Sequence, residues 1–199
     1  MAFFPAYYLI VARFVMTKQK LLWLGLKLFT CGIVYLISRN NEISAPDDIV
    51  LLYIFLSFGI LANGIIVYRI RQFEQASLFF YRGLPVSYFK RFLNYSTLYF
   101  LLLVPEFITL IMLAPKHLDL IIAIRFSLCS YSLLLLMNSI TFIQNFKIKD
   151  FLKILLLIFC VQLVFINTIG LTFWYLLCFI LAILLFVTNY YKFESTEHS

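Results

Sequence analysis

The sequence contains little of what most enzymes use. Only 13% of its 199 residues are charged, and it has two histidines, His117 and His198, too far apart for the His-Glu-x-x-His helix of zinc proteases. Its six glycines form neither a Gly-x-Ser-x-Gly elbow nor a Gly-x-x-x-x-Gly-Lys phosphate loop, and no aspartate lies inside a long apolar run. The sequence therefore predicts a chain that is not an enzyme and binds no cofactor or metal of its own.

Cysteine chemistry is not indicated either. The four cysteines, Cys31, Cys129, Cys160 and Cys178, all lie within apolar runs and have no metal-ligand spacing. We interpret them as small buried hydrophobic residues.

Apolar residues are what the sequence has in excess. They make up 64% of the chain, and 19% of the residues are aromatic, which is more apolar surface than a soluble domain of this length can bury. A membrane-spanning helix needs about 20 apolar residues. The sequence predicts an all-α polytopic membrane protein, a single transmembrane domain over residues 1–199, with six spans near residues 21–37, 49–68, 92–113, 118–142, 151–165 and 171–189.

The basic residues predict the orientation. The net charge is +7, and twelve lysines and arginines fall on one side of the predicted spans, whereas Arg39 and Lys116 alone fall on the other. By the positive-inside rule both ends are cytoplasmic, in the inner membrane of a bacterium, with residues 190–199 as a cytoplasmic tail. Residues 1–20 are expected to form an amphipathic helix and a basic segment at the membrane interface. This placement of the charges argues against a nucleic-acid partner.

The cytoplasmic loop between the second and third spans, residues 69–91, has a pattern of its own. Phe73, Ala76, Phe80 and Leu84 recur at helical intervals, which predicts a short cytoplasmic helix. Pro85 cannot continue that helix. Ser87 is placed to cap the third span, because a serine hydroxyl accepts a hydrogen bond from a free backbone N–H. Taken alone, these features fit a surface helix that joins two spans.

The same loop resembles the permease family of type-2 ATP-binding-cassette exporters. In that family an acidic residue begins a short cytoplasmic helix, and a Leu-Pro-Val-Ser-like turn and basic residues lead into the third span. The matching residues here are Glu74, Leu84, Pro85, Val86, Ser87 and Lys90.

The resemblance implies a coupling loop that docks in a cleft of a separate ATPase subunit, with Glu74 and Arg82 making polar contacts there. ATP and Mg would be bound by that subunit, and a second permease half, identical or related, would complete the transporter. The sequence departs from the family between spans five and six, where residues 166–170 leave no room for re-entrant helices.

Three ionisable residues lie inside the predicted spans: Lys27, Glu106 and Arg125. Charges at this depth cost several kcal/mol unless they are paired or hydrated. Lys27 is expected to extend its ammonium back to the cytoplasmic interface. Glu106 and Arg125 are each seven residues from the outer end of neighbouring spans, so an ion pair between them is expected, with contact to a substrate as the alternative.

Uncharged polar residues in the apolar runs are expected to form hydrogen bonds between helices. They are Asn63, Asn138, Gln144, Gln162 and Asn167.

Two other functions remain open from the sequence. A substrate-binding membrane subunit of a vitamin uptake system also has six spans at this length, and a non-transporting scaffold of a membrane complex is compatible with short outer loops. The proteins that co-purify with the chain discriminate among these alternatives, and the substrate is not indicated.

Overall fold

The described part of the chain is helical. The computed structural model describes residues 7–40, 46–78, 87–117, 119–143, 147–168 and 170–195. Its helices are α1 (Tyr7–Lys18), α2 (Lys20–Asn40), α3 (Pro46–Ser77), α5 (Tyr88–His117), α6 (Leu120–Ile140), α7 (Ile148–Thr168) and α8 (Leu171–Ser195).

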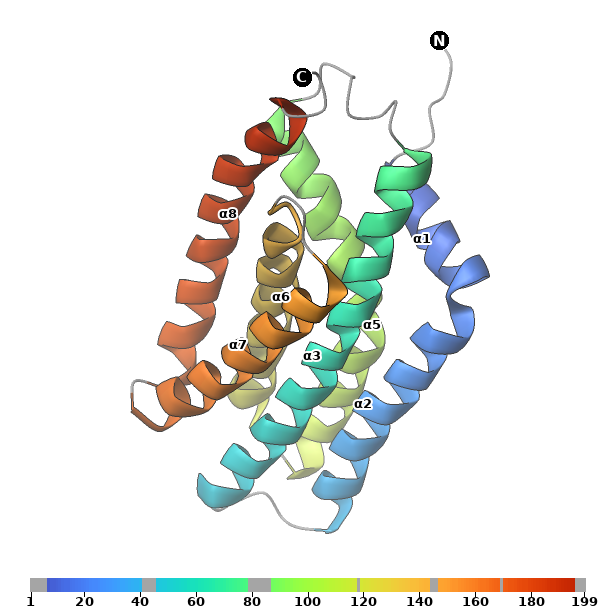
Figure 1. The fold of residues 1–199 in the computed structure, drawn as a ribbon. Helices are drawn as coiled ribbons and strands as arrows, with labels where there is room; N and C mark the ends of the chain where they lie inside the picture. Colours follow the sequence, from blue (N-terminus) through green and yellow to red (C-terminus); the bar gives the residue numbers. More distant parts are fainter. Residues whose placement is uncertain are drawn as a thin grey trace.

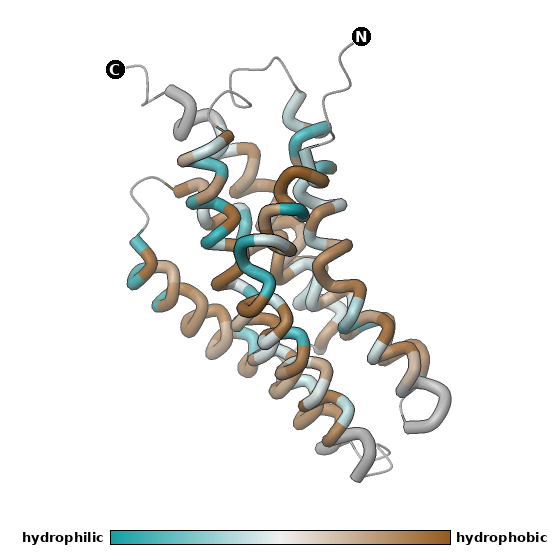
Figure 2. Tube along the Cα trace, turned by 90° about the vertical axis from the view of Figure 1, so that its right-hand side faces the viewer, coloured by the Kyte–Doolittle hydropathy of each residue, from teal (hydrophilic) through white to brown (hydrophobic). Residues whose placement is uncertain are grey.

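The long helices run side by side between two ends of the molecule (Figure 1). α6 packs most extensively on α8 and also lies against α3 and α5, while α2 lies against α3 and α5. α7 crosses obliquely against α3 and α8 (Figure 1). Hydrophobic residues prevail along the tube, and hydrophilic residues gather mainly in the half where α5 begins and α8 ends (Figures 1 and 2).

The apolar runs form helices close to the predicted spans, and four of these helices are long and apolar enough to cross a membrane: α3, α5, α6 and α8. A fifth crossing results if α1 and α2, which meet at 88°, are taken as one bent span. α7 is not among these four helices, and three charged residues, Lys149, Asp150 and Lys153, lie within its first six residues. The chain is therefore a multi-pass membrane protein by helix length and composition, whereas six crossings and the inward position of both ends stay predictions.

The amino-terminal helix packs onto the bundle by one face. Tyr7, Val11 and Val15 of α1 are buried, and Arg13 and Lys18 are exposed. This spacing of three and four residues places the apolar side chains on one side of the helix. α1 thus packs on the bundle by one face, while its amphipathic role at the membrane interface stays a prediction.

The end of α3 differs from the prediction. The cytoplasmic helix predicted around Phe73, Glu74 and Ala76 was expected to be separate from the second span. These three residues instead lie in the last turns of α3, which continues unbroken from Pro46 to Ser77. The physical reason is that Val67, Ile70 and Leu78 are buried, so the apolar face of α3 extends past the polar residues that suggested an interface. Residues 79–86 lie outside the described part of the chain.

Polar side chains link the helices, as expected for groups removed from water. The Tyr99 hydroxyl of α5 donates to Asn138 Oδ1 of α6 at 2.9 Å, and Gln162 of α7 donates to the Ser57 hydroxyl of α3. Asn63 also bonds across helices, as described below. The prediction of interhelical hydrogen bonds is confirmed for Asn63, Asn138 and Gln162. The side chains of Gln144 and Asn167 are outside the described residues.

The contact between α2 and α3 is close enough to require glycine. A Cβ added to Gly59 would overlap the γ-methyl of Thr30, whereas one added to Gly32 of α2 would meet nothing within 4 Å. We expect Gly59→Ala to lower the free energy of unfolding by about 1–3 kcal/mol through overpacking. Gly32→Ala, the matched control, should raise it by about 0.5–1 kcal/mol, since alanine favours the helix.

Unfolding in detergent micelles, followed by loss of helical circular dichroism, measures both effects. Combining Gly59→Ala with Thr30→Ala should restore most of the lost stability, because the overlapping methyl is removed. Equal stability of the Gly59 and Gly32 variants would contradict the close contact.

Candidate functional site

A lysine in the middle of an apolar helix provides the first part of the site. Lys27, Thr30 and Val34 are buried at intervals of three and four residues, so one stripe of α2 faces α3 and α5. Lys27 is only 5% exposed. Its ammonium is therefore held inside the bundle and does not reach back to the interface as expected from the sequence.

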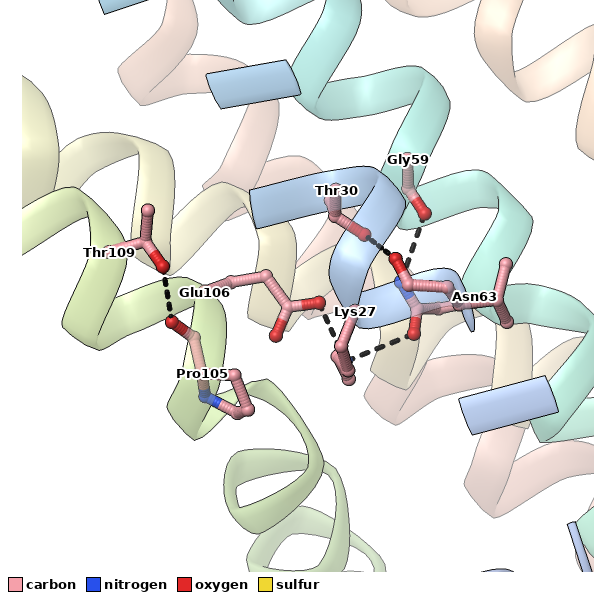
Figure 3. A network of polar contacts seen from close by, with 8 residues as sticks. Lys27, Thr30, Gly59, Asn63, Pro105, Glu106 and Thr109 are labelled. Atoms are coloured by element: carbon pink, nitrogen blue, oxygen red, sulfur yellow. Dashed lines mark hydrogen bonds and ion pairs between the residues drawn. The ribbon is translucent and has the colours of Figure 1, made fainter. Parts of the chain in front are cut away.

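The partner of Lys27 is a glutamate on α5. Glu106, 2% exposed, lies on a buried stripe with Leu103 and Leu110, and its Oε1 is 2.6 Å from Lys27 Nζ. Both charges are removed from solvent, and their mutual attraction offsets part of the desolvation cost of each. The pair joins α2 to α5 across the interior of the bundle (Figure 3).

A third helix contributes an amide. Lys27 Nζ donates to Asn63 Oδ1 of α3 at 3.0 Å, while Asn63 Nδ2 donates to the Gly59 carbonyl at 2.9 Å (Figure 3). The second bond fixes which end of the amide faces the lysine. Lys27, Asn63 and Glu106, which we call the buried triad, thus connect three helices through one ammonium group.

The second carboxylate oxygen of Glu106 is not part of the ion pair. Glu106 Oε2 is buried and has no hydrogen-bond partner among the described residues. A carboxylate oxygen in this state can accept a hydrogen bond from a ligand or from water, and leaving it unmet costs free energy. The triad therefore combines a structural ion pair with one free acceptor inside the membrane-spanning part of the protein.

The predicted pairing of Glu106 with Arg125 is wrong. Arg125 is exposed on α6, on the same face as the exposed Ile121, Ile124 and Leu128. The two residues were matched by their depth along the helices, but depth does not determine the direction in which a side chain points. The rotation of α6 turns Arg125 away from the bundle interior.

A second polar cluster lies near the end of α3. Arg71 Nη1 is 3.1 Å from Glu74 Oε2, and the Tyr95 hydroxyl of α5 donates to the same oxygen at 3.2 Å. The guanidinium carbon of Arg71 lies 4.1 Å from the ring centroid of Phe142, which follows α6. Arg71, Glu74, Tyr95 and Phe142, which we call the α3–α5 clamp, fix the end of α3 to α5 and to the segment after α6.

The α3–α5 clamp limits the contacts that Glu74 can make with another protein. Glu74 is 3% exposed, because it continues the buried stripe of Val67, Ile70 and Arg71. Its role in ATPase coupling stays a prediction, but its carboxylate is directed into the bundle. Exposed side chains on either side of the loop, such as Gln75 and Lys90, are better placed for contact with another protein.

Of the other predicted coupling residues, Ser87 is described. It directly precedes α5, and its carbonyl accepts a hydrogen bond from the Arg91 N–H at 3.1 Å, so it is at the N-cap position. A cap through its hydroxyl stays a prediction. Arg82, Leu84, Pro85 and Val86 lie outside the described residues.

Sequence reasoning did not identify Tyr95 or Arg71 as members of a site. Tyr95 is one of thirteen tyrosines, and Arg71 was assigned to the solvated basic loop. The available signal was the three-residue spacing of Arg71 and Glu74, which places opposite charges on one helical face.

Comparison of the chain with known protein families, with curated proteins and with solved structures found no match in any of the three.

Proposed function

We propose that this multi-pass membrane protein is the membrane-spanning subunit of an ATP-driven exporter of the ATP-binding-cassette type, working with a separate ATPase subunit. The observation that carries the proposal is the α3–α5 clamp, which lies on both sides of the loop that resembles the coupling loop of such exporters. Glu74 precedes the loop, Tyr95 follows it, and a hydrogen bond joins them.

A coupling loop transmits force only if the helices on both sides of it move with it. The bond between Tyr95 and Glu74, together with the ion pair between Arg71 and Glu74, ties the end of α3 to the start of α5. A displacement of the loop by a partner therefore acts on both helices together, and not on a flexible connection.

The buried triad extends this link into the membrane. Glu106 follows Tyr95 by eleven residues on α5, which is about 16 Å at the rise of an α-helix. Through Lys27 and Asn63 it contacts α2 and α3. The clamp thus connects α3 to α5 at one depth, and the triad connects α2, α3 and α5 at another. Glu106 Oε2 offers an acceptor for a polar group that enters the bundle.

The proposal requires two partners. One is an ATPase subunit at the end of α3 and the start of α5, where Gln75 and Lys90 are exposed. The other is a second membrane half, a copy of this chain or a related subunit. The chain has apolar side chains on its surface for such a contact, for example Ile180, Leu184 and Val187 on α8.

Gentle extraction and pull-down of the tagged protein from its native cells test the proposal. We expect a nucleotide-hydrolysing subunit to be retained by the wild type, and Lys90→Glu to lower its recovery about tenfold, which corresponds to about 1.4 kcal/mol. Lys18→Glu is the matched control, because Lys18 is likewise an exposed lysine but lies on α1, which is not one of the two helices that flank the loop.

If the wild type retains no nucleotide-hydrolysing subunit, the exporter proposal is wrong. Recovery of an adjacent membrane coupling protein would instead favour the substrate-binding subunit of an uptake system, and recovery of a larger assembly without any ATPase would favour a scaffold.

A further inference from the structure

A groove lies between α3 and α7, apart from the buried triad and the α3–α5 clamp. Its volume is about 190 Å³. Each helix contributes four side chains at intervals of three, one and three residues, so each presents one continuous stripe. The lining consists of Phe58, Leu61, Ala62 and Ile65 from α3 and Leu152, Leu155, Leu156 and Phe159 from α7. All eight side chains are apolar.

Two aromatic contacts mark the ends of this α3/α7 groove. Tyr68 and Phe151 have ring centroids 5.5 Å apart, and Phe58 and Phe159 have centroids 6.3 Å apart. The helical segments between these contacts span about 12–15 Å at 1.5 Å per residue. This is close to half of the roughly 30 Å hydrocarbon thickness of a bilayer, that is, the depth of one leaflet.

One end of the groove is cationic. Arg69 follows Ile65 by four residues on α3, and Lys149 and Lys153 precede Leu156 by seven and three residues on α7. All three cations are exposed, and the contact between Tyr68 and Phe151 places them at the same end. In Figure 2 the helix after the grey connection on the left, α7, begins in teal and continues in brown.

One carboxylate lies at this cationic end. Asp150 is 3.7 Å from Lys153 in an exposed ion pair. Exposed pairs of this kind contribute little to stability, so Lys153 can exchange this partner for another anion. Among the described residues, Arg69, Lys149 and Lys153 outnumber this carboxylate, so the end of the groove is positively charged.

We propose that the α3/α7 groove holds one acyl chain of an anionic phospholipid, whose phosphate is bound by Arg69, Lys149 and Lys153. The apolar stripe matches a hydrocarbon chain, its length matches one leaflet, and the cations lie where the headgroup of that leaflet would be. Basic side chains at a membrane surface attract anionic lipids by about 1 kcal/mol each.

The size of the groove argues against a protein helix as its occupant. A helix is about 10 Å wide, so a groove of about 190 Å³ between two packed helices is too small to enclose one. An extended hydrocarbon chain is narrow enough to fit, and its negatively charged headgroup accounts for the cations at one end.

Spin-labelled lipids test the proposal on the whole protein in phosphatidylcholine vesicles. The probes are phosphatidylglycerol and phosphatidylcholine labelled near the end of an acyl chain, and the measured quantity is the fraction of each probe immobilised by the protein. We expect the wild type to prefer phosphatidylglycerol. Arg69→Gln with Lys149→Gln and Lys153→Gln should lower that preference at least fivefold at low salt, and less at high salt.

Three exposed cations elsewhere provide the control: Arg13, Lys18 and Lys90, each replaced with glutamine. This variant has the same net charge as the groove variant. It removes exposed cations that are not on α3 or α7, so it should keep most of the preference. Loss of the preference in both variants would show attraction by overall charge and overturn the proposal, as would a wild type without any preference.

A second pair of variants tests the apolar part. Ala62→Phe fills the groove and should lower the immobilised fraction of both probes, whereas Ala76→Phe, at an exposed position on the same helix, should not. If Ala62→Phe does not fold, Leu156→Ala at an exposed lining position replaces it, with the same expected decrease. An immobilised fraction that neither lining variant changes would mean that a second copy or a partner covers the groove, and the lipid proposal would be wrong.

Discussion

Replacing Glu106 with leucine is expected to lower the free energy of unfolding by about 3–5 kcal/mol. The substitution leaves the Lys27 ammonium inside the bundle with the Asn63 amide as its remaining hydrogen-bond partner among the described residues, and an unpaired buried charge is costly. Lys27→Met should have an effect of similar size, because Glu106 would lose its counter-ion. Chemical unfolding in micelles or nanodiscs, followed by circular dichroism, measures both.

The double variant separates pairing from individual contributions. Lys27→Met combined with Glu106→Leu removes both charges and should be far more stable than the sum of the single effects predicts. A residual loss of about 1–3 kcal/mol is expected, because Asn63 Oδ1 loses its donor.

Arg125 provides the matched control for this cycle. It is a cation at an exposed position on α6, so Arg125→Ala combined with Glu106→Leu should show simple additivity. Coupling of Glu106 to Arg125, or additivity between Lys27 and Glu106, would contradict the buried triad. A double variant that is stable but does not transport would assign the triad a role in transport.

Replacing Phe142 with alanine is expected to cost a similar amount, about 3–5 kcal/mol. Phe142 is 1% exposed, and its ring lies 5.2–5.7 Å from the rings of Tyr95, Phe186 and Tyr190. It also forms the aromatic face beneath the Arg71 guanidinium. The substitution therefore removes a packed ring and a cation–π contact at once.

Two variants distinguish these contributions. Phe142→Leu keeps most of the volume but removes the ring face, and should cost about 2 kcal/mol, the size of a desolvated cation–π interaction. Phe173→Ala is the control, since Phe173 is 61% exposed on α8 and should change stability by less than about 1 kcal/mol. Thermal unfolding of the three variants in one detergent provides the comparison, and equal losses for Phe142 and Phe173 would contradict a central role for Phe142.

The positions of the helices could be predicted from the sequence to within a few residues over most of the chain. Residues 21–37 became α2, Lys20–Asn40, and residues 118–142 became α6, Leu120–Ile140. The larger error was at α3. Charged residues suggested that this helix ends near Tyr68, but its buried face continues and the helix ends at Ser77. Charge alone is a poor marker of a helix end when the charged side chains are paired with neighbours.

The candidate site was predicted only as a set of residues, not as pairs. Lys27 and Glu106 stood out as charges in apolar runs, yet Lys27 was expected at the interface and Glu106 beside Arg125. Glu74 stood out through the loop pattern, but its contacts with Arg71 and Tyr95 could not be read from the loop.

The sequence by itself determined that the chain is helical, apolar and long enough to cross a membrane several times. The reason is that backbone N–H and C=O groups in hydrocarbon must form hydrogen bonds within their own segment, so the stable form of a long apolar run is an α-helix. The tertiary structure alone decided which charges meet. Position along a helix sets the depth of a side chain, but its direction depends on the rotation of the helix, and that rotation is set by packing against neighbouring helices. Lys27 and Glu106 are 79 residues apart in the chain and come together only through the contact of α2 with α5.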